Sequence, residues 1–235
     1  PLLEKAGVRK FFAGPESFTP DTNTLLGAVP EVKNFFVCCG FNSIGIGSGG
    51  GAGKVTAEWM MNGHINEDLF IYDIKRFQKF HSEVKFITER ITETLGDLYG
   101  MHWPYKQHKT SRNQKLFPYH EELKKAGACF GVSSGYERPM WFALNNEKPE
   151  FKYSYNDQNW YPAVKFETKN AREHVGLFDL TAFSKYDIKG ENAHSELQKI
   201  CTANVKDEIG KTTYTQMLNK DGGIETDLTV VCLDK

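Results

Sequence analysis

The chain has 235 residues, of which 40% are hydrophobic and 25% charged, and its formal net charge is −1. These values are ordinary for a globular protein with one sizeable core or two modest ones. Because acidic and basic residues are balanced and interspersed, we expect neither a nucleic-acid partner nor an anionic membrane as a partner.

The cysteines and the two ends of the chain narrow the class further. The five cysteines are odd in number and form no Cys-x-x-Cys pair, which argues against a disulfide framework or a zinc knuckle and favours a reducing compartment. We find neither a long apolar run nor the pattern of a signal peptide. Since the chain opens at Pro1 without a methionine and stops at Lys235 after a strand-like run, we expect it to be truncated at both ends.

The first third has the pattern of an α/β unit. The apolar run over residues 34–39 predicts a buried strand, which leads into a glycine-dense loop over residues 40–53. A helix through Val55 and Trp59 follows, and the pair Asn62-Gly63 predicts its end.

The middle third predicts one long helix and an irregular connector. Apolar residues at spacings of three and four predict an amphipathic helix over residues 75–99. Its apolar face would contain Phe77, Phe80, Val84, Ile87, Ile91, Leu95 and Leu98. Residues 100–118 contain Trp103-Pro104 and many polar residues, so we predict an irregular connector there.

The last third has an α+β pattern. It predicts a helix over residues 166–175, an alternating strand over residues 183–188 and a helix over residues 193–200. Two further strands are joined by residues 219–223, where Asp-Gly is a strong hairpin signal because a tight turn needs positive φ.

The glycine-dense segment partly matches two nucleotide-binding motifs. Residues 45–50 satisfy Gly-x-Gly-x-x-Gly, but no second strand ending in an acid follows at the expected distance. A P-loop is disfavoured because Ser48 replaces its first glycine and Val55 replaces the hydroxyl residue that would hold Mg²⁺. What remains is a glycine-rich backbone before a helix N-terminus, which can approach a flat or anionic ligand closely or can simply cross a tight helix–sheet junction.

A first resemblance rests on residues 18–21 (FTPD), 26–27 (LG), Asn34, 40–46 (GFNSIGI) and 49–53 (GGGAG). Together they resemble the closing segment of the flavin domain in the D-amino-acid-oxidase-like family. In that family this stretch closes over the isoalloxazine ring, and backbone donors of the loop and helix N-terminus meet its carbonyl end. The resemblance implies that FAD is bound by Gly40, Phe41, Asn42, Ser43, Gly45 and Ile46.

The resemblance continues into the middle of the chain. Residues 72–77 (YDIKRF) and 135–142 (GYERPMWF) are similar to the central connector of the dimethylglycine and sarcosine dehydrogenases. We interpret Arg76, Glu137 and Arg138 as ion-pair or packing residues, because such residues are more often structural than catalytic.

A second resemblance rests on residues 175–180, 183–190, 214–219 and 222–230. They look like the opening half of the aminomethyltransferase domain of the glycine cleavage system. In that family an aspartate after the double-glycine turn lies near folate N10, and it matches Asp227, while Tyr214 and Phe183 match pocket-lining residues. An acid on a strand is often only part of a solvated face, so a structural reading of Asp227 stays open.

One position departs from the glycine cleavage pattern. Those proteins often carry paired aspartates where this chain has Thr226-Asp227, a form that resembles the flavin-linked relatives. The departure favours capture of an imine-derived one-carbon unit over free aminomethyl transfer.

These resemblances imply a fold of mixed α/β and α+β class in three parts. Residues 1–71 would be the C-terminal piece of a D-amino-acid-oxidase-like FAD domain, and residues 72–142 a helical and irregular central connector. Residues 143–235 would be the first half of an aminomethyltransferase-like folate-binding domain. The catalytic base for amine oxidation and the dinucleotide half of the flavin site are expected outside this chain.

The implied function is FAD-dependent oxidative demethylation of a methylated amine, dimethylglycine or sarcosine, with Asp227 helping tetrahydrofolate to capture the carbon. We expect this chain alone to be inactive. A carrier protein would accept the electrons. The expected compartment is the cytoplasm of a bacterium or the mitochondrial matrix of a eukaryote. Two alternatives stay open: a non-catalytic regulatory subunit of the pyruvate dehydrogenase phosphatase type, and a folate-dependent transferase without flavin chemistry.

Overall fold

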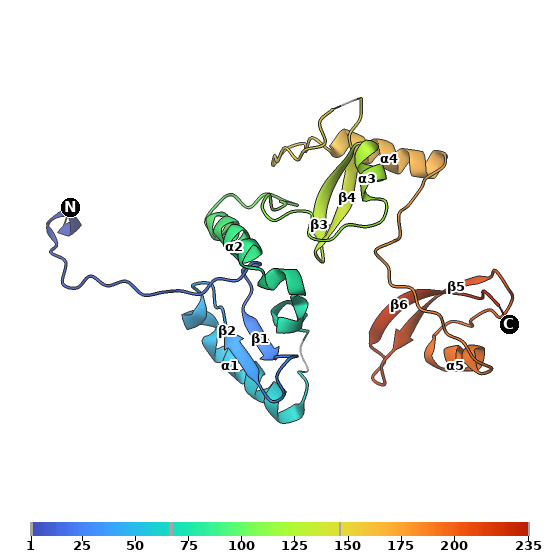
Figure 1. Ribbon diagram of the computed structural model, residues 1–235, viewed down its shortest axis with the longest axis horizontal. Helices are drawn as coiled ribbons and strands as arrows, with labels where there is room; N and C mark the ends of the chain where they lie inside the picture. The colour runs from blue at the N-terminus through green and yellow to red at the C-terminus, as the bar shows by residue number, and fades with distance from the viewer. Residues whose placement is uncertain (1, 66–67, 146, 235) are drawn as a thin grey trace. The chain divides into compact units, whose positions relative to one another are not determined.

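The computed structural model describes residues 2–65, 68–145 and 147–234, which form two compact units, Pro1–Phe178 and Asp179–Lys235 (Figure 1). The helices and strands of the first unit are β1 (Leu25–Ala28), β2 (Phe36–Cys39), α1 (Gly45–Asn62), α2 (Val84–Leu98), α3 (His120–Lys125), β3 (Ala128–Ser133), β4 (Tyr136–Phe142) and α4 (Tyr161–Glu173). Those of the second unit are α5 (Ala193–Ile200), β5 (Thr212–Leu218) and β6 (Ile224–Val231). Among the described residues, no helix combines the length and apolar character needed to cross a membrane.

Helix α1 packs along the antiparallel pair β1–β2 (Figure 1). Its Trp59 is buried and meets the ring of Phe36 edge to face, with 6.4 Å between ring centroids. The Trp59 ring also lies where a Cβ on Gly27 would be, only 2.5 Å from its nearest ring carbon. Because Gly27 also has φ of +110°, this contact requires glycine for both conformation and space.

The structure corrects the predicted loop over residues 40–53. Helix α1 already begins at Gly45, so the loop before it is only residues 40–44. Glycine weakens a helix without forbidding it, and the burial of Ala52 and Trp59 stabilises the glycine-rich turns. The predicted end is confirmed, because Gly63 adopts φ of +77° and donates its N–H to the carbonyl of Trp59.

The predicted helix over residues 75–99 is wrong in its first part. Two short 3-10 turns, Ile74–Arg76 and Lys79–Ser82, precede α2. The carboxylate of Asp73 and the ring of His81 accept backbone N–H groups in these turns, which offers the backbone an alternative to the α-helical pattern.

The predicted buried face of this helix is also wrong. The buried residues of α2 are Phe86, Arg90 and Thr94, whereas Val84 is 80% exposed. Arg90 is buried because its guanidinium stacks on Phe86 and donates to the carbonyl of Thr110.

The rest of the first unit is centred on the hairpin β3–β4. The irregular connector over residues 100–118 is confirmed, since it contains neither a helix nor a strand. Trp141, Cys129 and Ala163 form a small core between the hairpin and α4. Helix α4 begins at Tyr161, earlier than the predicted residue 166, because Pro162 is well suited to a first helical turn.

In the second unit α5 and the hairpin β5–β6 are as predicted. Thr215, Met217 and Val230 are on the face of the hairpin that packs toward α5. The predicted strand over residues 183–188 is wrong: this segment forms no strand, because no described segment offers it a hydrogen-bonded partner.

We expect Gly27→Ala to lower the free energy of unfolding of the first unit by about 3 kcal/mol, from backbone strain and from displacement of the Trp59 ring. Urea unfolding followed by tryptophan fluorescence measures this, since all four tryptophans are in the first unit. Gly53→Ala is the matched control: its added Cβ meets open space in a helix, so it should stabilise by about 0.5–1 kcal/mol. Equal effects of the two changes would contradict the role of Gly27.

Candidate functional site

The loop before α1 is held in an unusual backbone conformation. Gly40, Asn42 and Ser43 have φ of +67°, +50° and +65°. Left-handed conformations are costly for residues with a side chain, although asparagine tolerates them better than most. Surrounding contacts must therefore hold the loop in place.

The amide of Asn42 provides those contacts. Its side chain is 2% exposed, donates to the carbonyl of Gly40 at 2.7 Å and accepts the N–H of Thr19 at 2.9 Å. The Asn42 N–H itself donates to the carbonyl of Ser17. Asn42 therefore ties residues 17–19 to the loop, and its side chain is occupied within the protein.

The end of the loop and the first turn of α1 have backbone N–H groups without a hydrogen-bond acceptor among the described residues. Within the described part of the chain, the N–H groups of Ser43, Gly45 and Ile46 have no acceptor. The side chain of Ile46 is fully exposed, and a Cβ on Gly47 or Gly49 would meet nothing within 4 Å. Open N–H groups, the positive end of the helix dipole and a bare glycine surface can receive a carbonyl-rich planar ring or an anion.

The six residues expected at FAD differ in what they offer a ligand. Ser43, Gly45 and Ile46 offer backbone donors, while Gly40 and Asn42 shape the loop from buried positions. The ring of Phe41 packs beside Gly45, where an added Cβ would lie 3.3 Å from the Cβ of Phe41. This donor set fits the carbonyl end of an isoalloxazine ring.

We expect Asn42→Ala to destabilise the first unit by about 2–4 kcal/mol, because it leaves the Gly40 carbonyl and the Thr19 N–H without their partner. Asn34→Ala is the matched control. Asn34 also has a φ of +60°, but it is exposed and makes no side-chain hydrogen bond to the described residues, so its cost should be about 1 kcal/mol. Urea unfolding of both variants distinguishes the contribution of the hydrogen bonds from that of the backbone conformation. Equal losses of stability would contradict the role of Asn42 in joining residues 17–19 to the loop.

Arg76 joins two segments of the first unit. Its Nε and Nη2 donate to the two carboxylate oxygens of Asp21 at 2.7 and 3.1 Å, and Nη2 also donates to the carbonyl of Asn23 at 2.9 Å. The Arg76 side chain is only 8% exposed and lies over the ring of Phe77. These contacts give Arg76 a structural role.

Glu137 is a buried acid whose carboxylate is paired on both oxygens. It is 2% exposed and accepts Nε and Nη2 of Arg112 as well as the N–H of Asn113. Burial alone would raise the pKa of Glu137, but the hydrogen bonds from Arg112 and Asn113 outweigh it and hold the pKa below its ordinary value of 4.5. The pair therefore links the irregular connector of residues 100–118 to β4. Arg138, the neighbouring residue on β4, is exposed.

We expect Glu137→Gln to lower the free energy of unfolding by about 3–5 kcal/mol at pH 7, because Arg112 would stay largely buried without its counter-charge. Since the folded-state pKa of Glu137 is lowered, its stabilisation is complete above pH 4.5 and is lost as the pH falls through the folded-state pKa. Urea unfolding at a series of pH values should therefore show a shallower acid loss in the variant. Glu121→Gln, in an exposed pair with Lys124, should change the free energy of unfolding little. An equally small change for Glu137→Gln would contradict a stabilising role of the Glu137–Arg112 pair.

The exposed face of the β5–β6 hairpin carries the residues expected at folate. The hydroxyl of Tyr214 donates to Oδ2 of Asp227 at 2.9 Å across the two strands. The ring of Tyr214 is 63% exposed, and Asp227 is exposed as well. A carboxylate oriented by one donor beside an accessible aromatic ring can position an amine and accept the face of a planar ligand.

The third residue expected at folate is not part of this pair. Phe183 is 65% exposed in the segment without a strand, where its N–H donates to the carbonyl of Leu180 and its own carbonyl accepts Nζ of Lys185. Thr226 is on the same strand as Asp227, directly before it, and its hydroxyl donates to the backbone carbonyl of Asp227. The structure therefore brings together Tyr214 and Asp227 only.

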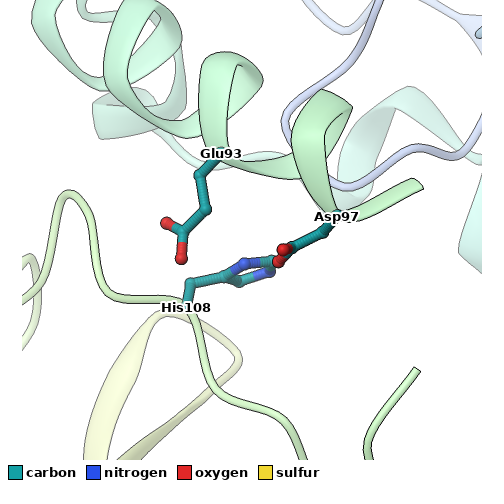
Figure 2. Close-up of side chains that lie close together, drawn as sticks. All are labelled: Glu93, Asp97 and His108. Atoms are coloured by element: carbon teal, nitrogen blue, oxygen red, sulfur yellow. The ribbon is translucent and has the colours of Figure 1, made fainter. Parts of the chain in front are cut away.

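Several buried polar residues were missed by the sequence reasoning. Thr19 and Arg112 complete the contacts of Asn42 and Glu137, and no local pattern marks them. A further group combines Glu93 and Asp97 of α2 with His108 of the connector (Figure 2). The four-residue spacing of the two acids on a predicted helix was the available signal for this group.

Comparison with protein families gives two adjacent matches. Residues 62–116 match the family model described as FAD dependent oxidoreductase central domain, and residues 119–235 match the GCVT N-terminal domain. The two matches together define the class of the chain: part of the central domain of FAD dependent oxidoreductases joined to a domain of the glycine cleavage T-protein type.

Curated relatives match over almost the whole chain. The 4-methylaminobutanoate oxidase (formaldehyde-forming) of Paenarthrobacter nicotinovorans is 42% identical over 99% of this chain and 28% of that protein. The mitochondrial sarcosine dehydrogenase of Homo sapiens is 34% identical over 98% of this chain and 28% of that protein. The mitochondrial pyruvate dehydrogenase phosphatase regulatory subunit of Mus musculus is 32% identical over 100% of this chain and 27% of that protein.

The chain belongs to the dimethylglycine and sarcosine dehydrogenase family, in which an FAD-dependent oxidoreductase is fused to a T-protein-like domain. It spans about 28% of the length of the curated relatives that it matches.

Proposed function

We propose that this chain contributes to an oxidative N-demethylase that uses FAD and tetrahydrofolate. In this proposal residues 1–71 close the flavin site, residues 72–142 form the central connector and residues 143–235 begin the folate-binding domain. The observation that carries the proposal is the exposed Tyr214–Asp227 pair, because it belongs to the part that matches a T-protein domain and has the chemistry to handle an amine nucleophile.

The flavin half of the proposal assigns one task to the start of α1. FAD, when bound, would take a hydride equivalent from the N-methyl carbon and leave an iminium on the substrate. The N–H groups of Ser43, Gly45 and Ile46 would then donate to the carbonyl end of the ring and favour negative charge there. Phe41, Gly40 and Asn42 would keep this loop in shape.

The folate half assigns one task to the β5–β6 face. The iminium carbon would be attacked by an amine nitrogen of tetrahydrofolate, and the demethylated amine would leave as the methylene bridge closes. Asp227, oriented by Tyr214, would hold or accept the proton of the attacking nitrogen. The ring of Tyr214, together with Phe183, would contact the pterin.

The substrate class is a small N-methylated amino acid. We propose sarcosine or dimethylglycine, and the name of the bacterial relative adds 4-methylaminobutanoate to the compounds to be tested. A carrier protein would accept the electrons. The proposed compartment is the cytoplasm in a bacterium or, following the names of the mammalian relatives, the mitochondrial matrix in a eukaryote.

In the complete, flavin-loaded enzyme to which this chain contributes, we expect Asp227→Asn to leave the rate of flavin reduction unchanged and to lower the yield of methylene-tetrahydrofolate about 10²-fold, with free formaldehyde rising in its place. Stopped-flow absorbance measures the first quantity, and product analysis measures the other two. Asp221→Asn, in the exposed turn of the same hairpin, is the matched control. If flavin reduction and methylene-tetrahydrofolate yield fall together in Asp227→Asn, the role of Asp227 is wrong.

A regulatory protein is the second candidate, because the phosphatase regulatory subunit matches the whole chain. Anaerobic addition of sarcosine, dimethylglycine and 4-methylaminobutanoate to the flavin-loaded protein separates the two. Bleaching of the flavin band by any of them supports the demethylase. A flavin that none of them reduces supports the regulatory reading.

A further inference from the structure

Three side chains with metal-binding groups meet between α2 and the irregular connector of residues 100–118, and none of them is among the residues assigned to flavin or folate. Glu93 and Asp97 are one helical turn apart on α2, and His108 of the connector places its ring between their carboxylates (Figure 2). One ligand atom from each residue lies within 4.8 Å of those of the other two, and all three residues are half-buried.

The connector fixes Glu93 and still leaves it a lone pair. Oε1 of Glu93 accepts the N–H of Lys109 at 2.6 Å, while Oε2 accepts the N–H of Thr110 at 2.9 Å and its hydroxyl. Since each carboxylate oxygen has two lone pairs, Oε1 keeps one for another partner. These three bonds fix the position of the carboxylate beside residues 109 and 110.

The other two groups also have open positions. Oδ1 of Asp97 accepts Nζ of Lys106 at 2.5 Å, and no described residue donates to its Oδ2. Over residues 2–65, 68–145 and 147–234, the imidazole of His108 makes no hydrogen bond. An imidazole nitrogen without a hydrogen-bond partner is free to bind a metal ion.

Two cationic side chains already lie beside the carboxylates of the group. The ammonium of Lys106 lies against Asp97, and the guanidinium of Arg90 lies 4.0 Å from Glu93. Arg90 is buried and held by the carbonyl of Thr110, whereas the Lys106 side chain is 29% exposed on a flexible stem. Lys106 can therefore move into solvent and be replaced by another cation.

We propose that Glu93, Asp97 and His108 form a three-ligand site for a borderline divalent cation such as Zn²⁺, which would link the irregular connector to α2. One imidazole nitrogen and two carboxylate oxygens suit this class of ion, while Ca²⁺ and Mg²⁺ prefer more oxygen ligands. Ligand atoms of a tetrahedral site are roughly 3.4 Å apart, so the separations of up to 4.8 Å must close by small side-chain rotations. Water would supply the fourth ligand.

The site can be tested by titrating the 235-residue chain with Co²⁺. The visible absorption band of bound Co²⁺ reports both binding and coordination geometry. We expect one Co²⁺ per chain, displaced by Zn²⁺. His108→Gln and Asp97→Asn should each weaken binding at least about tenfold. Lys106→Gln should strengthen binding severalfold, since it removes the competing charge.

His102→Gln is the matched control, because His102 is on the same connector but is exposed and bonds to the carbonyl of Leu98. It should leave the titration unchanged. Circular dichroism of each variant verifies that it is folded. The proposal is overturned if the wild-type titration does not saturate, if His108→Gln binds as wild type does, or if a thiolate charge-transfer band shows that the exposed Cys38 or Cys39 holds the ion.

Discussion

Because the described strands form only two-stranded sheets, the first unit depends on buried polar pairing between segments that are far apart in the sequence. Two-stranded hairpins cannot bury a continuous core by themselves. The amide of Asn42, the guanidinium of Arg76 and the carboxylate of Glu137 each join such segments through several hydrogen bonds. A buried group of this kind is stabilising only while all its partners are present, so each of these links is sensitive to a single change.

The same pairing separates the residues that shape a site from those that can act in it. Glu137 and Asp227 are both acids on strands of antiparallel hairpins. Glu137 is 2% exposed and is held by three donors, so a ligand has little access to it, whereas Asp227 is exposed and has one donor, Tyr214. The surroundings of each carboxylate, and not its residue type, make Asp227 the better candidate for chemistry.

The start of α1 shows a similar division within five residues. Asn42 uses its side chain and its N–H for internal bonds, and the next turn leaves the N–H groups of Gly45 and Ile46 open. Glycine has two roles here. It permits the positive φ of Gly40 in the loop, and it leaves the backbone of the helix exposed. A rigid loop followed by open donors is a suitable way to hold a flat cofactor without covering it.

The sequence by itself determined the features that depend on neighbouring residues. The helix end at Asn62-Gly63, the helix Ala193–Ile200, the irregular connector and the hairpin with its turn over residues 219–223 were all predicted, because caps and tight turns are set by local backbone preferences. The two resemblances also placed the chain in its family and selected Tyr214 and Asp227.

Only the tertiary structure decided the features that depend on distant partners. Helix α1 extends back to Gly45 although glycine disfavours helices, since packing of Trp59 against β1 stabilises it. Residues 183–188 alternate like a strand but form none, because a strand exists only with a hydrogen-bonded neighbour. The buried face of α2 includes Arg90 because the connector supplies the carbonyl that it needs, and periodicity cannot register a partner twenty residues away.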